Sequence, residues 1–329
     1  MHHSTIPDPS VVVSRNASSR LPRGTDERCV VTSSEAELLR VLRAQCERRF
    51  DQSRFFMRVA SGAITTAALG YVFGQYGHFR LQLHQWFAAC MLLAQDASQP
   101  AQRWAVMSLA DHVYTDLRDD HDALFAECLQ SFGFPRGLLH VGLPSSATRR
   151  YTEQFLDECR APTATWLDAT ATLAGRELSV AVRNQRLVHG YFAPRGEPAP
   201  TWIALHAELE VDHCLDALRP VIAQHADSST TLEPAMDRAF SRHADYLDAL
   251  LEEYEIRCTD ADRETAGSTS QGELCDGSEL TGERLGLRLN LGVDEIGRVP
   301  VTDVDHQEAL EADVVEARVE HEEEGDVLG

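Results

Sequence analysis

Lysine is absent from this chain of 329 residues, so all 30 of its cationic side chains are arginines. We interpret this as a bias of a GC-rich coding sequence and assign it no function. The eight cysteines form no C-x-x-C pair, which argues against a thiolate zinc site and favours reduced thiols. A secretory signal is also missing, since the N-terminal segment is polar and broken by prolines. We therefore expect a cytoplasmic protein.

Long runs of strongly apolar residues are lacking as well. Val59 to Phe79 contains no charged residue and would be long enough to cross a bilayer. Its Ala, Gly, Thr, Ser and Gln residues suit close helix packing in a protein core better than lipid contact. There is also no basic patch of the kind that binds nucleic acid. We predict no membrane span and no nucleic-acid partner.

Negative charge is concentrated at the end of the chain. Residues 251–329 hold 23 acidic residues and six arginines, a balance of −17, which leaves −5 of the net −22 for residues 1–250. We predict a disordered N-terminal segment over 1–33, a folded domain over 34–256 and an acidic, mostly disordered tail over 257–329. Alternating leucines at 285–291 could form one short strand, and partner docking is an alternative role for the tail.

Helical periodicity runs through the folded domain. Ser34 to Glu37 is consistent with a capping box. We expect helices over about 35–50, 65–83, 101–117, 120–129, 147–160, 163–189, 201–225 and 231–255, with a further apolar stretch over 86–92. Gly133–Gly137 and the prolines of 192–200 mark loops. Sustained β-branched alternation is missing, so the domain is predicted to be all-α.

The sharpest chemical signal is a stripe of side chains in the helix expected at 201–225. His206, Glu210 and His213 lie at about 0°, 40° and −20° around a helix that turns 100° per residue. Two imidazoles and a carboxylate suit iron, manganese or zinc. Glu210 and His213 also form the Glu-x-x-His pair used by diiron bundles. The alternative is an exposed histidine-rich face on which Glu210 pairs with a neighbour.

Three further residues add weight to a metal site. Asp116 and His121 lie on either side of a predicted tight turn and can converge, although acids at this turn can also simply cap a helix. Glu177 is the lone acid of an apolar stretch, where a carboxylate must be solvated, paired or metal-bound. Its neighbour Arg176 is an alternative ion-pair partner, although adjacent residues diverge on a helix. The pair Asp303 and His306 has similar spacing but lies in the acidic tail.

The order of these pieces resembles the haem-oxygenase-like diiron oxidases. The likeness covers about residues 35–255 and includes Gly62–Thr65, Asp120–Phe125 and Phe132-Gly133. It implies a single seven-helix haem-oxygenase-like bundle that binds two Fe(II) ions and uses O2 as co-substrate. The metal ligands that it implies are Asp116, His121, Glu177, His206, Glu210 and His213. Asp116 falls where the family usually has Glu, so Asp111 is the fallback. His78, His112 and His189 are expected in the core, or else beside the ligands.

The activity that the resemblance implies is that of an iron-dependent oxidase or oxygenase acting on a small organic substrate. The reactions include N-oxygenation, C–C cleavage and decarboxylation of amino-acid-like or fatty-acid-like molecules. Two alternatives stay open. One is a cofactor-free enzyme like the thiaminases or the pyrroloquinoline-quinone-forming enzymes, with Cys90, Cys128 or Cys214 as nucleophile. The other is a non-catalytic metal-binding or regulatory protein. An electron-donor partner and a homodimer are also left open.

Overall fold

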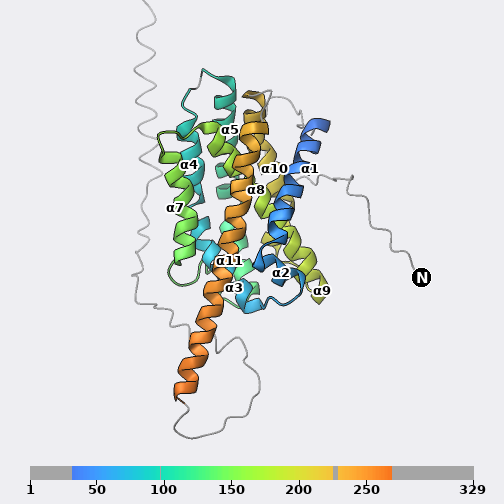
Figure 1. Ribbon diagram of the computed structural model, residues 1–329, viewed down its shortest axis with the longest axis vertical. Coiled ribbons are helices and arrows are strands. Elements are labelled where there is room, and N and C mark those ends of the chain that lie inside the picture. The colour runs from blue at the N-terminus through green and yellow to red at the C-terminus, as the bar shows by residue number, and fades with distance from the viewer. Residues whose placement is uncertain (1–31, 97, 225–228, 269–329) are drawn as a thin grey trace, which may run out of the picture. The chain divides into compact units, whose positions relative to one another are not determined.

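In a computed structural model of the chain, the residues described are 32–96, 98–224 and 229–268 (Figure 1). Within them the chain forms eleven α-helices and one π-helical segment, and no strand. The all-α prediction is confirmed, while the helices outnumber the seven expected. The expectations for residues 1–31, for a strand at 285–291 and for the acidic tail beyond residue 268 lie outside the described residues.

The helices are joined mostly by short connections. In chain order they are α1 (Ser33–Asp51), α2 (Arg54–Ala60), α3 (Thr66–Arg80), α4 (Leu83–Leu93), α5 (Pro100–Arg118), α6 (His121–Ser131), α7 (Ser146–Arg160), α8 (Trp166–Leu187), the π-helical segment η1 (Val188–Phe192), α9 (Ala193–Arg195), α10 (Thr201–Gln224) and α11 (Ser229–Ser268). All eight predicted helices are present, and α4 covers the apolar stretch at 86–92. The short α2 and the η1–α9 segment were not predicted.

Two helix ends differ from expectation. The capping box is formed by Thr32 and Glu35, since the Glu35 N–H donates to Thr32 Oγ1 (3.2 Å) and the Thr32 N–H donates to Glu35 Oε2 (2.7 Å). Glu37 pairs instead with Arg40 on the surface. At the other end, α11 runs past the expected boundary at residue 256, because no glycine or proline interrupts it between Pro234 and Gly267.

The centre of the bundle is α8, which packs against α10 on one side and α11 on another (Figure 1). Of its 22 residues, 18 are buried. A helix buried on nearly all faces has no exposed stripe for polar residues. Arg176, Glu177 and Arg183 therefore lie inside the protein, and each needs a partner there.

Close contact between α3 and the segment that precedes α7 fixes another wall of the interior. The Val141 N–H donates to the Gly74 carbonyl oxygen at 3.1 Å. One turn further along α3, a Cβ on Gly77 would lie 1.8 Å from the carbonyl oxygen of Leu139, so only glycine fits. This approach holds the intervening Tyr76 in the core beside α8.

The uncharged stretch from Val59 to Phe79 is divided between two helices. It leaves α2 at Ala60 and enters α3 at Thr66, where the side chain of Thr65 accepts a hydrogen bond from the Ala68 N–H. In the part of the chain that the structure describes, no helix is both long enough and apolar enough to span a membrane.

Candidate metal centre

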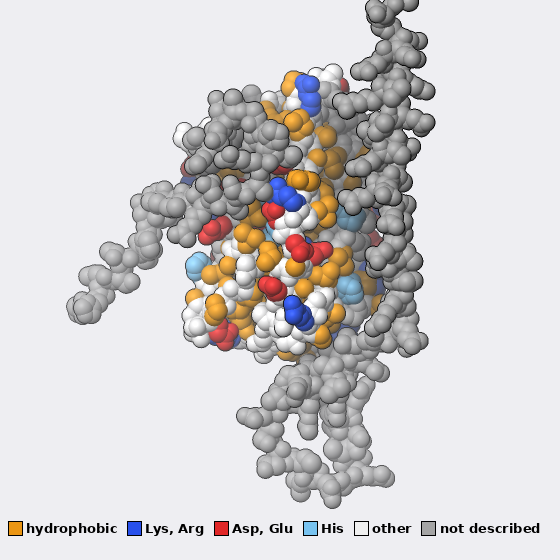
Figure 2. All heavy atoms as spheres, turned by 180° about the vertical axis from the view of Figure 1, so that it is seen from behind, with side chains coloured by type: hydrophobic (Ala, Val, Ile, Leu, Met, Phe, Trp, Pro, Cys, Tyr) orange, Lys and Arg blue, Asp and Glu red, His pale blue; other side chains and the backbone are white. Residues whose placement is uncertain are grey.

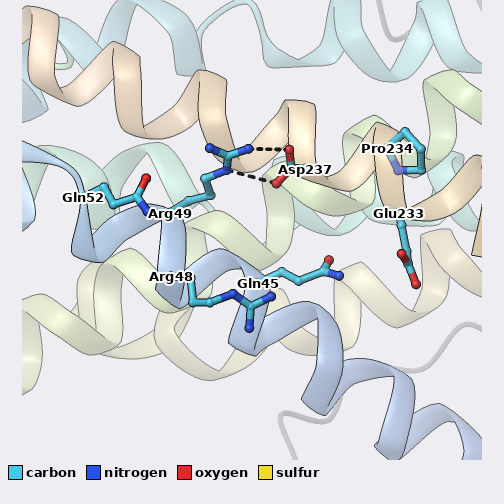
Figure 3. A pocket seen from close by; sticks show the side chains of 7 residues that line it. All are labelled: Gln45, Arg48, Arg49, Gln52, Glu233, Pro234 and Asp237. Atoms are coloured by element: carbon cyan, nitrogen blue, oxygen red, sulfur yellow. Dashed lines mark hydrogen bonds and ion pairs between the residues drawn. The ribbon is translucent and has the colours of Figure 1, made fainter.

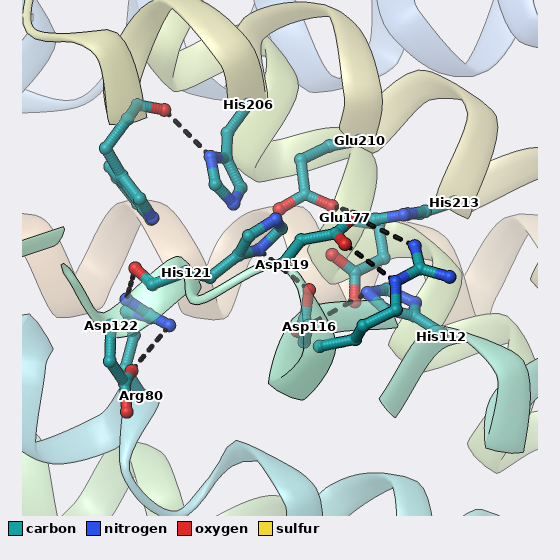
Figure 4. Close-up of polar contacts among 12 residues, drawn as sticks. Arg80, His112, Asp116, Asp119, His121, Asp122, Glu177, His206, Glu210 and His213 are labelled. Atoms are coloured by element: carbon teal, nitrogen blue, oxygen red, sulfur yellow. Dashed lines mark hydrogen bonds and ion pairs between the residues drawn. The ribbon is translucent and has the colours of Figure 1, made fainter. Parts of the chain in front are cut away.

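Four helices bring seven ligand-type side chains together in the interior (Figure 4). They are His112 and Asp116 from α5, His121 from the start of α6, Glu177 from α8, and His206, Glu210 and His213 from α10. All six residues predicted from the sequence are among them. The structure adds His112, which the sequence placed in the core.

One group of four lies at the meeting point of α5, α8 and α10. His112, Glu177, Glu210 and His213 each offer a ligand atom, and these atoms all lie within 4.8 Å of one another. The rings of His112 and His213 are 3.7 Å apart between centroids. Potential ligand atoms from three helices that lie this close together can bind one cation.

Asp116 joins this group to a second one. Its Oδ1 atom lies 2.9 Å from His121 Nδ1, and its Oδ2 atom lies 3.8 Å from His112 Nε2. The ring of His121 is in turn 5.0 Å from that of His206. The shorter Asp side chain therefore reaches the centre. Asp111 is exposed and lies outside the cluster, so the fallback assignment is not supported.

The turn between α5 and α6 makes this convergence possible. Asp120 adopts a left-handed conformation, with φ of 50°, and its side chain accepts a hydrogen bond from the Ala123 N–H at 3.3 Å. Asp is one of the few residue types that tolerate this backbone conformation. Two different acids therefore serve the two purposes. Asp120 caps α6, while Asp116 points inward to His121.

His206 is oriented by the backbone of its own helix. Its Nδ1 atom lies 2.8 Å from the carbonyl oxygen of Trp202, one turn earlier. A carbonyl oxygen can only accept, so Nδ1 carries the proton and Nε2 keeps its lone pair. Metal-bound histidines are typically held in this way, with one ring nitrogen donating to a carbonyl and the other facing the ion.

Burial keeps two of the imidazoles uncharged. Loss of solvent lowers the pKa of His112 to about 3 and that of His206 to about 4. Both rings are therefore neutral at pH 7 and can act as ligands. For His213 burial acts in the same direction, but the carboxylate of Glu210, 2.8 Å from Nδ1, outweighs it and raises the pKa to about 9.

Glu177 is fully buried and only half satisfied. One oxygen, Oε2, accepts from Arg176 Nη1 at 2.6 Å, while Oε1 has no hydrogen-bond partner. The alternative that Arg176 is the partner of Glu177 is therefore what the structure shows, although the two residues are adjacent on the helix. Arg176 also donates to the Tyr76 hydroxyl at 2.8 Å. A buried carboxylate oxygen without a donor is the kind of atom that a cation would satisfy.

The donor set therefore fits a cation of the iron, manganese or zinc type. It combines imidazole nitrogens with carboxylate oxygens and contains no thiolate. Three carboxylates face this interior, and the positive charges beside them are those of Arg176 and of the His213 ring, which Glu210 keeps protonated. Such an excess of buried negative charge is costly unless cations or protons neutralise it.

Two of the other histidines are clearly outside the centre. His78 is a core residue, as expected: it stacks on His140 at 4.1 Å, and its Nε2 lies 3.3 Å from the carbonyl oxygen of Val141. His189 is exposed on η1, which contradicts the expectation of a core position. His112 could have been found from its spacing to Asp116, since residues four apart lie on one helix face.

Among the described residues, neither surface pocket is lined by a comparable group of imidazoles and carboxylates. A hollow of about 540 Å³ lies between α1 and α11, where Arg49 forms a two-point ion pair with Asp237 (Figure 3). It shares no residue with the metal centre. On the face shown in Figure 2, acidic, basic and histidine side chains are scattered singly among apolar ones.

Comparison with solved structures identifies the fold. No family model matches the sequence, and no curated protein matches it. Among solved structures, a domain of unknown function with a haem-oxygenase-like fold from Shewanella denitrificans has a TM-score of 0.55 and 12% identity, covering 73% of this chain and 98% of that one. A CADD-like protein of unknown function from Nostoc punctiforme has a TM-score of 0.48 and 14% identity, covering 66% and 98%.

A third similar structure is a TenA family transcription regulator from Silicibacter, with a TM-score of 0.48 and 13% identity, covering 64% of this chain and 95% of that chain. At 12% identity, the likeness to the Shewanella denitrificans domain establishes the fold alone. The chain therefore has a haem-oxygenase-like all-α fold, as the sequence predicted.

Proposed function

We propose that this protein is a non-haem diiron oxidase or oxygenase that uses dioxygen to oxidise a small organic molecule. The observation that carries the proposal is the convergence of four imidazoles and three carboxylates from four helices. The neutral state of His112 and His206 and the unpartnered oxygen of Glu177 support it, because all three are what a metal site requires before the ion binds.

The two groups of side chains correspond to two neighbouring ion sites in this proposal. His112, Glu177, Glu210 and His213 would hold one iron. His121 and His206 would hold the second, with Asp116 placed between the two groups. When bound, ferrous ions supply the electrons and the open coordination positions that dioxygen activation needs.

In this proposal the protein orients the metal ligands and excludes water from the site. The Trp202 carbonyl fixes the ring of His206, and Arg176 holds one oxygen of Glu177. The side chains of Glu177 and Glu210 are almost fully shielded from solvent. Such shielding strengthens every interaction between charges in the centre and keeps water from a reactive species.

The cofactor-free alternative has less support. A thiaminase-like mechanism needs a cysteine that ionises readily. Burial instead raises the pKa of the Cys128 thiol to about 12 and that of Cys214 well above its ordinary value, and Cys90 is equally buried. Thiols of this kind are structural rather than nucleophilic.

Anaerobic loading of the full chain with ferrous iron tests the proposal. We expect two irons per chain by elemental analysis, followed by dioxygen consumption and a transient visible absorption band on exposure to air. His206→Ala and Glu177→Ala should each lose about one iron, because each removes a ligand from a different site.

His189→Ala is the matched control, since it removes an exposed histidine and should keep both irons. Unchanged iron stoichiometry in both ligand variants, or oxidase activity that persists in excess chelator, would contradict the proposal.

A further inference from the structure

Arg183 is a buried cation without an ionic partner. Its side chain is 1% exposed, and no carboxylate among the described residues forms an ion pair with it. Its only hydrogen bond is from Nε to the side-chain oxygen of the next residue, Asn184, at 3.0 Å, while Nη2 has no acceptor. A guanidinium is always charged in a protein, and burying it unpaired is costly.

Two neighbouring arginines, the buried Arg176 and the largely buried Arg80, have polar partners. Arg176 bonds to Glu177 and Tyr76, and Arg80 bonds to the His121 carbonyl and to Asp122. Arg183 differs from both, because aromatic rings lie against its guanidinium where a carboxylate would be expected. Its guanidinium carbon lies 4.4 Å from the ring centre of Tyr76, 5.2 Å from Phe73 and 5.6 Å from Trp202.

Two residues that contact Arg183 also carry buried donors without acceptors. Besides Nη2 of Arg183, neither Asn184 Nδ2 nor Trp202 Nε1 has a hydrogen-bond partner, and both atoms are buried. Asn184 bonds to Arg183, and Trp202 lies beside it. Three unpartnered donors in contacting residues call for a ligand that supplies acceptor oxygens and negative charge.

Two aromatic residues connect this place to the metal centre. Tyr76 touches Arg183 with its ring and Arg176 with its hydroxyl. Trp202 stacks on the ring of His206 at 4.3 Å, and its ring centre lies 5.6 Å from the guanidinium carbon of Arg183. Along α8, Arg183 is six residues from Glu177, a rise of about 9 Å.

We propose that Arg183 anchors the carboxylate of the substrate, with Asn184 and Trp202 as supporting donors. This inference rests on the proposed function and narrows its substrate class to carboxylic acids with an apolar or aromatic middle. The carboxylate would lie roughly two helical turns from the metal centre. The oxidised atom is then at the far end of the molecule, which favours N-oxygenation or C–C cleavage over decarboxylation.

Calorimetric titration of the metal-free full chain with 4-phenylbutyrate and with octanoate tests the proposal. We expect saturable binding at one site, and the neutral amides of both acids should bind more weakly. Arg183→Met should weaken binding of the acids by about tenfold or more, the usual consequence of removing a hydrogen bond to a charged group. Arg186→Met is the control, because Arg186 is on the same helix but pairs with Asp51 at the surface.

Thermal unfolding separates binding from structure. If Arg183 serves binding, Arg183→Met should leave the Tm of the metal-free protein unchanged or raised, since an unpaired buried charge is removed. Iron stoichiometry should also stay at the wild-type value. Acid binding that is equal in wild type and Arg183→Met, equal binding of acids and amides, or no binding by wild type would overturn the proposal.

The comparison of acids with amides uses the wild type alone, so it stands even if the variant fails to fold. Failure of the diiron proposal gives a different pattern. In that case the wild type would bind no iron, while its carboxylate binding would still depend on Arg183.

Discussion

Buried histidines outside the metal centre also respond to their surroundings. His243 on α11 is completely buried, with Nδ1 3.1 Å from the Tyr151 hydroxyl and its ring 6.1 Å from that of Phe50. Loss of solvent, reinforced by the nearby charges of Arg183 and Arg176, lowers the pKa of His243 well below its ordinary value. This histidine is therefore uncharged in the folded protein at neutral pH.

A pH dependence of stability follows for the metal-free protein. Because the folded pKa of His243 lies below the unfolded value of 6.5, the unfolded chain binds the extra proton first as the pH falls. The free energy of unfolding should drop below pH 6.5, with His243 contributing about 1.4 kcal/mol per pH unit. Urea unfolding of His243→Leu between pH 7 and pH 5 should show a correspondingly shallower slope.

His84→Leu is the matched control, since this histidine is exposed on α4. Other buried histidines titrate in both proteins, so the informative quantity is the difference in slope. Parallel curves for wild type and His243→Leu would show that His243 does not carry this dependence.

At the scale of residues, spacing along one helix was predictable and contacts between helices were not. The stripe of His206, Glu210 and His213 follows from helix geometry alone. His112 enters the centre because α5 packs against α10, and Arg176 reaches Glu177 because α8 is buried on all sides. The spacing of His112 and Asp116 shows that they share a helix face, but not that this face meets α10. The burial of α8 likewise cannot be read from the spacing of its residues.

Among the helices, α3 depends most visibly on small side chains. Its backbone approaches the segment before α7 so closely that Gly74 and Gly77 are both covered by it. The same segment receives two hydrogen bonds from the amide of Gln75, at the carbonyl oxygens of Val141 and Leu143. This contact positions the face of α3 that meets the arginines of α8.

Gly77→Ala should therefore be destabilising. The added Cβ would meet the Leu139 carbonyl oxygen at 1.8 Å, and a backbone atom cannot rotate away. We expect a loss of about 1–3 kcal/mol in the free energy of unfolding, the typical cost of forcing an extra carbon into a packed interior.

Gly190→Ala provides the comparison, because the nearest atom to its added Cβ is a side-chain methyl of Val59 at 3.3 Å. Denaturant unfolding of both variants should give a clearly smaller loss for Gly190→Ala. Equal losses would mean that the close approach at Leu139 is not what constrains α3.

At the scale of helices, the long periodic segments were predictable because each buries an apolar stripe. The short elements were not: α2 has seven residues and η1 has five, too few for a periodic signal. The end of α11 was misplaced because acidic composition was taken to mean loss of structure, whereas no glycine or proline lies between Pro234 and Gly267.

For the whole molecule, the metal centre joins elements that are distant in the chain. The side chains that we propose as ligands come from α5, α6, α8 and α10, so bound ions would link most of the bundle. A ligand that binds only the folded state stabilises it in proportion to its free concentration over the dissociation constant.

Ferrous iron should therefore raise the midpoint of thermal unfolding. At free iron a hundredfold above the dissociation constant, we expect an increase of about 5–10 °C for a domain of this size. Differential scanning fluorimetry under anaerobic conditions measures it. Excess chelator should reverse the shift, and His206→Ala should reduce it. An iron-independent midpoint in wild type would argue against a folded-state iron site.

The ion pair between Arg176 and Glu177 affects the order in which a newly synthesised chain folds and binds metal. The guanidinium already supplies positive charge at a carboxylate that would otherwise face the interior alone. Small zinc domains fold only when they bind their ion. Here the Arg176 guanidinium supplies the positive charge instead of an ion. We therefore expect the apoprotein to fold first and to bind metal afterwards.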